Sequence, residues 1–554
     1  FGSAGGGVVL VGGGWQGSGG LRQATTVTMN QGAIIDASAL TNGDGGTVVL
    51  WSDIKNPGSI TNVNGAIIAR GGATQGRGGN VETSAGLLNT ENIFVDTRAA
   101  DGSAGNWLLD PWNYVIGTNG ASDIATYLAT TNVLISTSAA TSIRLDSSGN
   151  CAGCGDMVIQ GAITYTGANA RRLTFKADSY ISLTASITST NAALDVILWT
   201  DAGATGGIGN GGYLYMAPGT SISTNGGKIV LAGGADTNSD GIPDGYAWNS
   251  KSAGQAGVML GDAGGLGSSV NLVSNGGDII IRGKTSGSSP YPGMLTQKTF
   301  KIDSGIGTIL IDATSSTGHG FEWVYGVAAD FSITSASTSS TAISITGTTS
   351  VAGYTGALIA LRTGSYLIQS TASTGGGIQI YGQNTAATGN QVYLSGTAGY
   401  AYILSKNGPI NISGAGANLG ITSGGVITFG ASSGVTINGV TSSVATSGSN
   451  ITLESSNFSL GVAYASTSGN ISFNGPTVLL GDQSIISTAG VITYASTINS
   501  DSSSTPRALT VNAGTGSVVF GGVIGGTYAL RNLSASGSAG ISINGNINIV
   551  TGLA

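Results

Sequence analysis

One short segment, "GGADTNSDGIPDG" (233–245), gathers oxygen-bearing side chains at regular intervals. Carboxylate, amide and carbonyl oxygens are the ligands that Ca²⁺ prefers, and a calcium loop needs Gly at its sixth position for a sharp turn. Gly241 takes that turn position, and positions one, three, five, seven and nine are Asp236, Asn238, Asp240, the Ile242 carbonyl and Asp244. The twelfth position is Ala247 instead of a bidentate carboxylate, so the pattern predicts weak calcium binding. The alternative is a long turn built from Asp, Asn and Gly.

The two cysteines, Cys151 and Cys154, lie close together in "NCAGCGD". A zinc site would need further Cys or His ligands, and the chain has a single histidine, His319. In an exported protein this spacing predicts a disulfide within one loop, with a bond to a neighbouring molecule as the alternative. We expect His319 to be a loop residue without a catalytic role.

Two tryptophans, Trp107 and Trp112, flank "LLDP" and offer an aromatic platform for a sugar. The alternative, which we favour, is that they fill corners of the fold. A polysaccharide-degrading enzyme would need paired carboxylates, or calcium with a base, on one face. Lys and Arg total 19 and are scattered, and their tight group is Arg171, Arg172 and Lys176. We therefore expect no catalytic activity.

The amino-acid composition limits the kinds of fold that can position these residues. Among 554 residues, 96 are Gly, 40% are hydrophobic and 8% are charged. The apolar fraction is too high for a disordered chain, so polar neutral side chains must cover the surface. A net charge of −7 provides no basic surface for nucleic acid or anionic lipid. No apolar run approaches the ~20 residues of a membrane span.

Short runs rich in Val, Ile, Leu, Tyr and Thr recur along the chain and predict strands. Gly, Asn, Ser or Thr flanks nearly all of them, as expected of turns. Examples are residues 46–53, 65–71, 227–233, 277–283, 307–313, 377–383, 450–456, 470–476 and 516–522.

The spacing of these runs favours one architecture over others. Sandwiches and propellers use frequent Asn-Gly or Asp-Gly hairpins, which are few here, whereas a loose period of ~20–30 residues is typical of stacked coils. Low charge also fits, because stacked coils place like side chains above each other. The sequence predicts an all-β, right-handed parallel β-helix. One short helix is expected at 121–130, where Ile124, Tyr127 and Leu128 have helical spacing and Ser122 takes the N-cap position.

Longer segments resemble a known family. Residues 42–86 and 95–117, with the stretch "NWLLDPW", are similar to the filamentous-haemagglutinin family of bacterial exoproteins. Shorter matches are at 193–207, 223–236 and 506–526. The resemblance implies a secreted β-helical adhesin or fibre subunit, exported by two-partner secretion through an outer-membrane partner.

We therefore expect one continuous solenoid over residues 1–554. Residues 1–120 and 160–235 are most similar to the family, 233–262 form a loop-rich insertion, and 263–554 form further irregular coils.

The expected function is that of an extracellular structural fibre or adhesin at the bacterial surface. Copies would associate end to end or laterally, because both ends of the sequence are strand-like and carry no evident cap. The alternatives are a glycan-binding spacer within a longer exoprotein and, less favoured, a polysaccharide-degrading β-helix.

Overall fold

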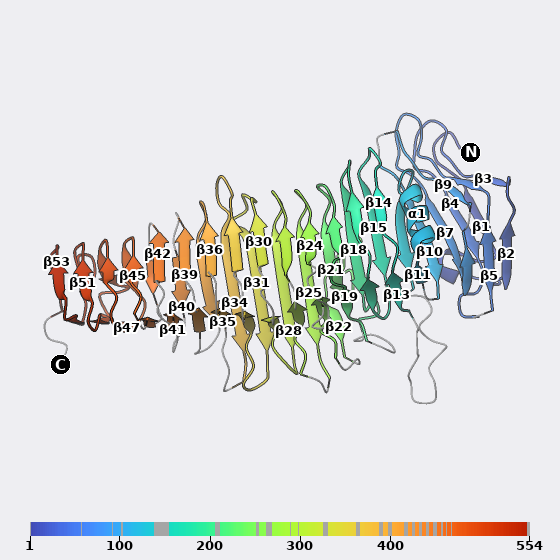
Figure 1. The fold of residues 1–554 in the computed structure, drawn as a ribbon. Coiled ribbons are helices and arrows are strands. Elements are labelled where there is room, and N and C mark those ends of the chain that lie inside the picture. The colour runs from blue at the N-terminus through green and yellow to red at the C-terminus, as the bar shows by residue number, and fades with distance from the viewer. Residues whose placement is uncertain are drawn as a thin grey trace. The chain divides into compact units, whose positions relative to one another are not determined.

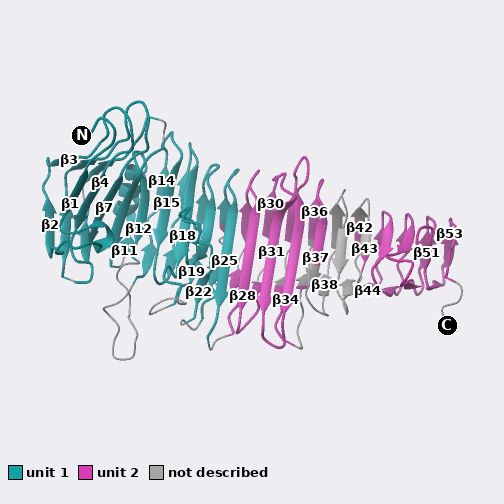
Figure 2. Cartoon of the chain, turned by 180° about the vertical axis from the view of Figure 1, so that it is seen from behind, with its two compact units in different colours: residues 1–259, 271–287 teal, residues 260–270, 288–554 magenta. Residues whose placement is uncertain are grey.

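The structure is a computed structural model of the 554-residue chain. The chain divides into two compact units, residues 1–259 with 271–287 and residues 260–270 with 288–554 (Figure 2). The residues that the structure describes are 2–56, 58–90, 92–100, 103–112, 114–137, 155–204, 211–250, 254–261, 269–287, 290–296, 299–324, 331–361, 366–386, 392–396, 401–414, 419–423, 427–431, 435–438, 443–446, 451–455, 458–460, 463–466 and 468–550.

The described residues of the first unit form short strands, one 3₁₀ turn, η1 (Trp15–Gly17), and one helix, α1 (Thr118–Tyr127). Its strands are β1 (Val8–Val11), β2 (Thr26–Met29), β3 (Ile34–Asp36), β4 (Thr47–Trp51), β5 (Ile60–Val63), β6 (Ala66–Ile68), β7 (Asn80–Ala85), β8 (Leu87–Asn89), β9 (Phe94–Asp96), β10 (Asn106–Pro111), β11 (Tyr114–Ile116), β12 (Asn132–Ser136), β13 (Met157–Ile159), β14 (Ile163–Tyr165), β15 (Arg171–Lys176), β16 (Ile181–Leu183), β17 (Ile187–Ser189), β18 (Leu194–Thr200), β19 (Leu214–Met216), β20 (Ser221–Ser223), β21 (Ile229–Gly233), β22 (Ala247–Asn249) and β25 (Ile279–Thr285). Strands β23 (Val258–Leu260) and β24 (Val270–Val273) contain residues of both units.

Most strands of the first unit pair in parallel with the strand three places later in the chain; around α1 the step is two, as for β10 with β12, and after the Asp-rich loop it is four, as for β21 with β25. Thus β15 pairs with β18, β13 with β16, and β14 with β17. Each of these coils therefore contributes one strand to each of three sheets, which is the pattern of a parallel β-solenoid (Figure 1). The repeated coil follows from the short strands, which bury their apolar side chains only against the coils above and below.

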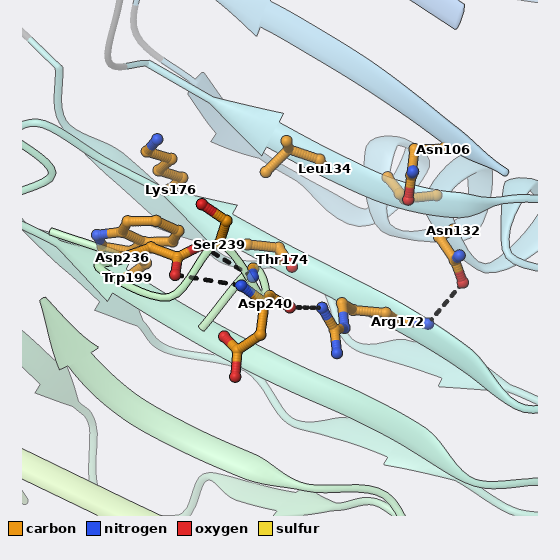
Figure 3. A pocket seen from close by; sticks show the side chains of 12 residues that line it. Asn106, Asn132, Leu134, Arg172, Thr174, Lys176, Trp199, Asp236, Ser239 and Asp240 are labelled. Carbon is orange, nitrogen blue, oxygen red and sulfur yellow. Dashed lines mark hydrogen bonds between the residues drawn. The ribbon is translucent and has the colours of Figure 1, made fainter. Parts of the chain in front are cut away.

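Successive coils stack their apolar residues in register in the interior of the first unit. One such column contains Val81, Trp107, Val133, Leu173 and Val196, all at most 1% exposed. Side chains at alternating positions of the same strands point outward, as the two-residue period of a strand requires. In β15 the outward residues are therefore Arg172, Thr174 and Lys176, as Figure 3 also shows.

Helix α1 lies in a coil of the first unit between β11 and β12, and it packs against β14 (Figure 1). Its buried side chains include Ile124 and Tyr127. Arg171, which points inward from β15, donates from Nε to the Leu128 carbonyl at 2.9 Å and from Nη2 to that of Ala129 at 3.2 Å. A cation at the carbonyl end of a helix is favourable because it complements the helix dipole.

The prediction of a helix was confirmed, but its predicted start was wrong. The helix begins at Thr118, before the expected residue 121, and its N-cap is Gly117 in place of Ser122. Gly117 has an extended backbone and makes no side-chain cap hydrogen bond. The apolar spacing marked only the buried turns, whereas the first turn of the helix is polar and small.

The second unit repeats the three-strand coil. Its strands are β26 (Met294–Thr296), β27 (Phe300–Asp303), β28 (Ile309–Ser315), β29 (Phe321–Val324), β30 (Phe331–Ser335), β31 (Thr341–Thr349), β32 (Ala357–Leu361), β33 (Tyr366–Ser370), β34 (Gly377–Asn384), β35 (Val392–Gly396), β36 (Ala401–Ser405), β37 (Ile410–Gly414), β38 (Leu419–Ser423), β39 (Ile427–Ala431), β40 (Val435–Asn438), β41 (Ser443–Thr446), β42 (Ile451–Ser455), β43 (Phe458–Leu460), β44 (Ala463–Ser466), β45 (Ile471–Phe473), β46 (Thr477–Leu479), β47 (Gln483–Ser487), β48 (Ile492–Tyr494), β49 (Ile498–Ser500), β50 (Ala508–Asn512), β51 (Ser517–Phe520), β52 (Asn532–Ser536) and β53 (Gly540–Ile543). Parallel pairs such as β28 with β31, β29 with β32 and β30 with β33 define its coils.

Stacked aromatic rings mark the interior of the second unit. Phe300, Phe331 and Tyr366 are in register on successive coils, with 5.4 Å between neighbouring ring centroids. Like residues in such a column add offset stacking to area burial. The predicted parallel β-solenoid with one short helix is therefore confirmed. Among the residues described, no helix has the length and apolar character needed to cross a lipid bilayer.

Candidate functional site

The Asp-rich loop, residues 234–244, connects β21 to β22 in the first unit. An antiparallel bridge between Gly233 and Gly245 closes its base, and the Asp244 amide donates to the Ala235 carbonyl at 2.9 Å. The loop is thus a compact excursion from the coil and keeps the two flanking strands in the stack.

One apolar side chain attaches the tip of this loop to the outer face of the sheet. Ile242, 9% exposed, packs in a cluster with Ile197, Trp199, Val230 and Ala232. The cluster explains why β18 and β21 are apolar on both faces, since the loop covers the outward one.

Hydrogen bonds from three sides also hold the loop backbone. The Trp199 indole Nε1 donates to the Gly234 carbonyl at 2.7 Å. The Arg172 Nη1 donates to the Asp240 carbonyl at 2.7 Å. The Arg282 Nη1 donates to the Pro243 carbonyl at 3.2 Å. The loop therefore has a defined position over β15 and β18.

The predicted calcium ligands accept hydrogen bonds from the amides of their own loop. Asp236 accepts from Gly241 at 2.9 Å, Asn238 from the Asp240 amide at 3.0 Å, and Asp240 from the Ile242 amide at 2.8 Å. Gly241 has a φ of +80°, as its place at the sharp turn requires. These bonds turn three side-chain oxygens toward consecutive amides of one turn.

Asp244 lies on the other side of the loop and accepts from the Thr237 amide at 2.8 Å and from its hydroxyl at 2.5 Å. These hydrogen bonds lower the pKa of Asp244, with the hydroxyl contributing most. Within the described part of the chain, no three His, Cys, Asp or Glu side chains are grouped closely enough to hold a metal ion. Calcium binding through Asp236, Asn238, Asp240, Ile242 and Asp244 stays a prediction.

A surface pocket with a volume of about 380 Å³ lies between this loop and the outward face of the neighbouring strands (Figure 3). The strands contribute Asn106, Asn132, Leu134, Arg172, Thr174 and Lys176 to its lining. Trp199 also lines it, and the loop contributes Asp236, Ser239 and Asp240. The pocket combines amides, two cations and apolar surface, which are the groups that bind a small polar ligand.

The two cations of the pocket differ in how they are held. Lys176 places Nζ 4.3 Å from the ring centroid of Trp199. The pKa of Lys176 is lowered, because burial has the largest effect. The charges of Asp178, Asp110 and Asp236 offset this effect in part. Arg172 instead forms an ion pair, with 3.5 Å between its Nε and a carboxylate oxygen of Asp195.

The amides of the pocket belong to a polar column along the outer edge of this sheet. Asn80, Asn106 and Asn132 are in register on β7, β10 and β12, and the Asn132 Oδ1 accepts from the Arg172 amide at 2.9 Å. Farther along, this edge carries alternating charges, Arg172, Asp195, Lys228 and Asp278. Alternation gives stacked coils attraction where like charges would repel.

Several carboxyl groups near the pocket are buried. Glu82, Asp110 and Asp178 are at most 3% exposed. Burial raises the pKa of Glu82 and of Asp178 to about 7, and it raises that of Asp110 well above its usual range. Neither oxygen of Asp110 has a hydrogen-bond partner among the described residues. These carboxyls are therefore inaccessible to a saccharide at the surface.

The aromatic platform, which was the less favoured of the two alternatives for Trp107 and Trp112, is not formed, because both side chains are buried. Trp107 is fully buried, donates from Nε1 to the Thr83 hydroxyl at 3.0 Å, and contacts Tyr127 of α1 edge-on with 4.5 Å between ring centroids. Trp112 is only 5% exposed. Both rings are buried, Trp107 within β10 and Trp112 directly after the end of this strand.

Among the described residues, the remaining candidate is His319, which does not line the pocket. His319 lies between β28 and β29, and its Nδ1 accepts from the Thr355 amide at 2.9 Å. Burial lowers its pKa to about 4, so the ring is a neutral acceptor at neutral pH. Cys151 and Cys154 lie outside the described residues, and their disulfide stays a prediction.

Sequence reasoning found the Asp-rich loop but missed the pocket beside it. Arg172 and Lys176 were noticed only as a basic group, and Trp199 was not considered. The alternation in "RRLTFK" (171–176) carries the signal, because it places both cations on one face of β15. No family model matches the chain, and no curated protein matches its sequence.

Proposed function

We propose that this chain is a non-catalytic structural or adhesive subunit of a secreted bacterial surface fibre. The observation that carries the proposal is the regular stack of parallel three-strand coils in each unit. Such a stack presents a long, repetitive surface and has few charges to oppose contact with another copy. The resemblance of residues 42–86 to filamentous-haemagglutinin exoproteins supports secretion through an outer-membrane partner.

Exposed apolar residues on two outer strands support association between copies. On β1, Val8 is 69% and Leu10 is 42% exposed, and on β53, Ile541 is 44% and Ile543 is 51% exposed. An edge strand with free backbone groups and apolar side chains is a template for another strand. We therefore propose that copies associate end to end through such strands, and a contact of this kind that does not close produces a filament.

Light scattering and negative-stain electron microscopy of the 554-residue chain test this proposal. We expect the average mass to rise with protein concentration, and we expect fibres in the micrographs. Replacing Val8 and Leu10 with Lys should lower the association, because charges on an edge strand oppose pairing. The matched control replaces Ile486 with Lys, because Ile486 is 41% exposed on β47, a strand that is paired on both sides. A stable monomer at high concentration would contradict the proposal.

A further inference from the structure

The first unit carries a row of alternating charges along the outer edge of one sheet, which we call the charge ladder. Its members are Arg172 on β15, Asp195 on β18, Lys228 directly before β21 and Asp278 directly before β25. Arg172 and Asp195 are in register, and the Lys228 amide donates to the Asp195 Oδ1 at 2.9 Å. The Ile229 amide donates to the Asp278 carbonyl at 2.9 Å. The four residues therefore follow one another on successive coils, with backbones about 4.8 Å apart.

The ion pairs within the charge ladder are loose and leave its side chains partly exposed. The Arg172 Nε lies 3.5 Å from an Asp195 oxygen, and the Lys228 Nζ lies 3.7 Å from an Asp278 oxygen. By comparison, the Nζ of Lys301 reaches its aspartate at 2.9 Å. The ladder side chains are between 29% and 43% exposed. Exposed ion pairs contribute little within one chain, so these charges remain available to a partner.

The charge ladder borders low turns on the side that faces away from the Asp-rich loop. On the loop side, the Arg172 Nη1 holds the Asp240 carbonyl. On the other side, the chain enters the strands through turns with Ala-Ala at 192–193 and Gly-Gly at 226–227 and 276–277. Because these residues are small, the ladder side chains extend beyond the turns beside them.

The order of the charges is complementary to its own reverse. Along the coils the order is plus, minus, plus, minus, and a second copy whose coils run the opposite way presents minus, plus, minus, plus. With a twofold axis between Asp195 and Lys228, Arg172 faces Asp278 of the partner subunit and Asp195 faces Lys228 of the partner subunit, so four opposite pairs form. A parallel copy in register would bring like charges together, and a displacement by one coil would leave at most three opposite pairs. Complementary charges fix the orientation and register of two partners more than their affinity.

We propose that two copies of this chain associate side by side through the charge ladders of their first units, with the coils running in opposite directions. Both copies use the same surface, so the contact closes at two copies. The inference rests on the proposed function for its setting in a surface fibre, and it adds a lateral contact to the end-to-end one. Salt distinguishes the two contacts, because ions screen exposed charges but do not weaken the burial of apolar side chains.

Sedimentation velocity tests the proposal on the full chain with Val8 and Leu10 replaced by Lys, which weakens the end-to-end contact. We expect a dimer at about 0.01 M salt that is at least about tenfold weaker at about 1 M, where the screening length falls from about 30 to about 3 Å. Asp195→Lys and Lys228→Asp should each weaken the dimer at least about tenfold, because each places like charges opposite one another. An equimolar mixture of these two variants should recover the parent affinity, because every lysine then faces an aspartate.

The double swap, Asp195→Lys with Lys228→Asp, tests the orientation. It removes both ion pairs within the charge ladder but keeps the four opposite pairs between antiparallel copies, so we expect a dimer like that of the parent. Lys301→Asp is the matched control, since Lys301 is 48% exposed in an ion pair outside the ladder, and it should leave the dimer unchanged. Circular dichroism should show all variants folded.

A monomer at low salt, or a mixture of the two single variants that does not dimerise, would overturn the proposal. A dimer in the mixture but not in the double swap would overturn the antiparallel order. None of these outcomes bears on fibres formed end to end, since that contact involves β1 and is measured in the chain with Val8 and Leu10 intact.

Discussion

Lys176 and Trp199 are in register on the neighbouring strands β15 and β18, and the ammonium lies 4.3 Å from the centroid of the indole ring. The indole Nε1 of the same tryptophan holds the Gly234 carbonyl at the base of the Asp-rich loop. One ring thus positions the pocket cation, and it also attaches the loop that forms the opposite wall.

Replacing this ring should be costly for stability. We expect Trp199→Ala to lower the free energy of unfolding by about 3–5 kcal/mol, as truncation of a buried aromatic residue does. The ring is 6% exposed and packs with Ile242, so its loss leaves a cavity. Denaturant unfolding followed by circular dichroism measures the loss. Trp248→Ala is the control, because Trp248 is only half-buried, and equal losses would contradict this account.

The buried Asp178 should make stability depend on pH. Burial raises its folded-state pKa from the usual 3.8 to about 7. Between these values the unfolded chain releases the proton and the folded chain keeps it, so the free energy of unfolding falls as pH rises and levels off above 7. Asp178→Asn should be more stable than the parent at pH 8 and should lose less stability between pH 5 and 8. The control is Asp240→Asn at the exposed loop, and an unchanged slope in Asp178→Asn would refute the assignment.

Calcium should bind the Asp-rich loop weakly. On protein treated with chelator, calorimetry with millimolar Ca²⁺ should give a small saturable heat. Asp244→Asn should reduce it, because this variant keeps an oxygen for Thr237 but removes the charge. Lack of any calcium heat in the parent chain would leave the loop as a turn whose carboxylates cap its own amides.

The helix should tolerate loss of the N-cap that the sequence suggested. Ser122→Ala should change the free energy of unfolding by less than about 0.5 kcal/mol, because Ser122 is exposed inside α1 and the N-cap is Gly117. Ile124→Ala should cost about 2–5 kcal/mol, since Ile124 is 1% exposed. Similar losses in both variants would mean that the helix begins where the sequence pattern placed it.

Cys151 and Cys154 should be oxidised in protein isolated without reductant. A short loop closed by a disulfide is expected in an oxidising compartment. Intact mass before and after reduction with alkylation measures free thiols directly. Two free thiols would contradict the prediction, and a disulfide-linked dimer would favour the bond between molecules.

The sequence was sufficient to predict the strands, because their signal is local. The run at 277–283 overlaps β25, and the run at 516–522 contains β51. Flanking Gly and the two-residue period indicate where such short strands lie and which residues share a face, although β25 ends two residues after the predicted run. The start of α1 was not predictable in this way, since no apolar residue marks its first turn.

The pocket could not be predicted because it depends on pairing between coils. Asn106, Lys176 and Asp236 come together only when β10, β15 and the loop after β21 take their observed registers. Each strand register is set by whole columns of interior side chains, so it cannot be predicted from a local sequence motif. Alternation within "RRLTFK" indicated the face of the two cations but not their neighbours.

Helix α1 has a consequence for how such a chain can change in length over evolution. The coils from β15 to β20 share one backbone design, because each contributes three strands to the same three sheets. If one of these coils were lost or duplicated, the coils on either side could still pair strand to strand in the same three sheets. Among the coils that the structure describes, the one with α1 has no equivalent, since Tyr127 packs on Trp107 and the helix end receives Arg171. Insertions and deletions of whole coils among related chains should therefore be concentrated in the three-strand coils, and the coil that contains α1 should be retained.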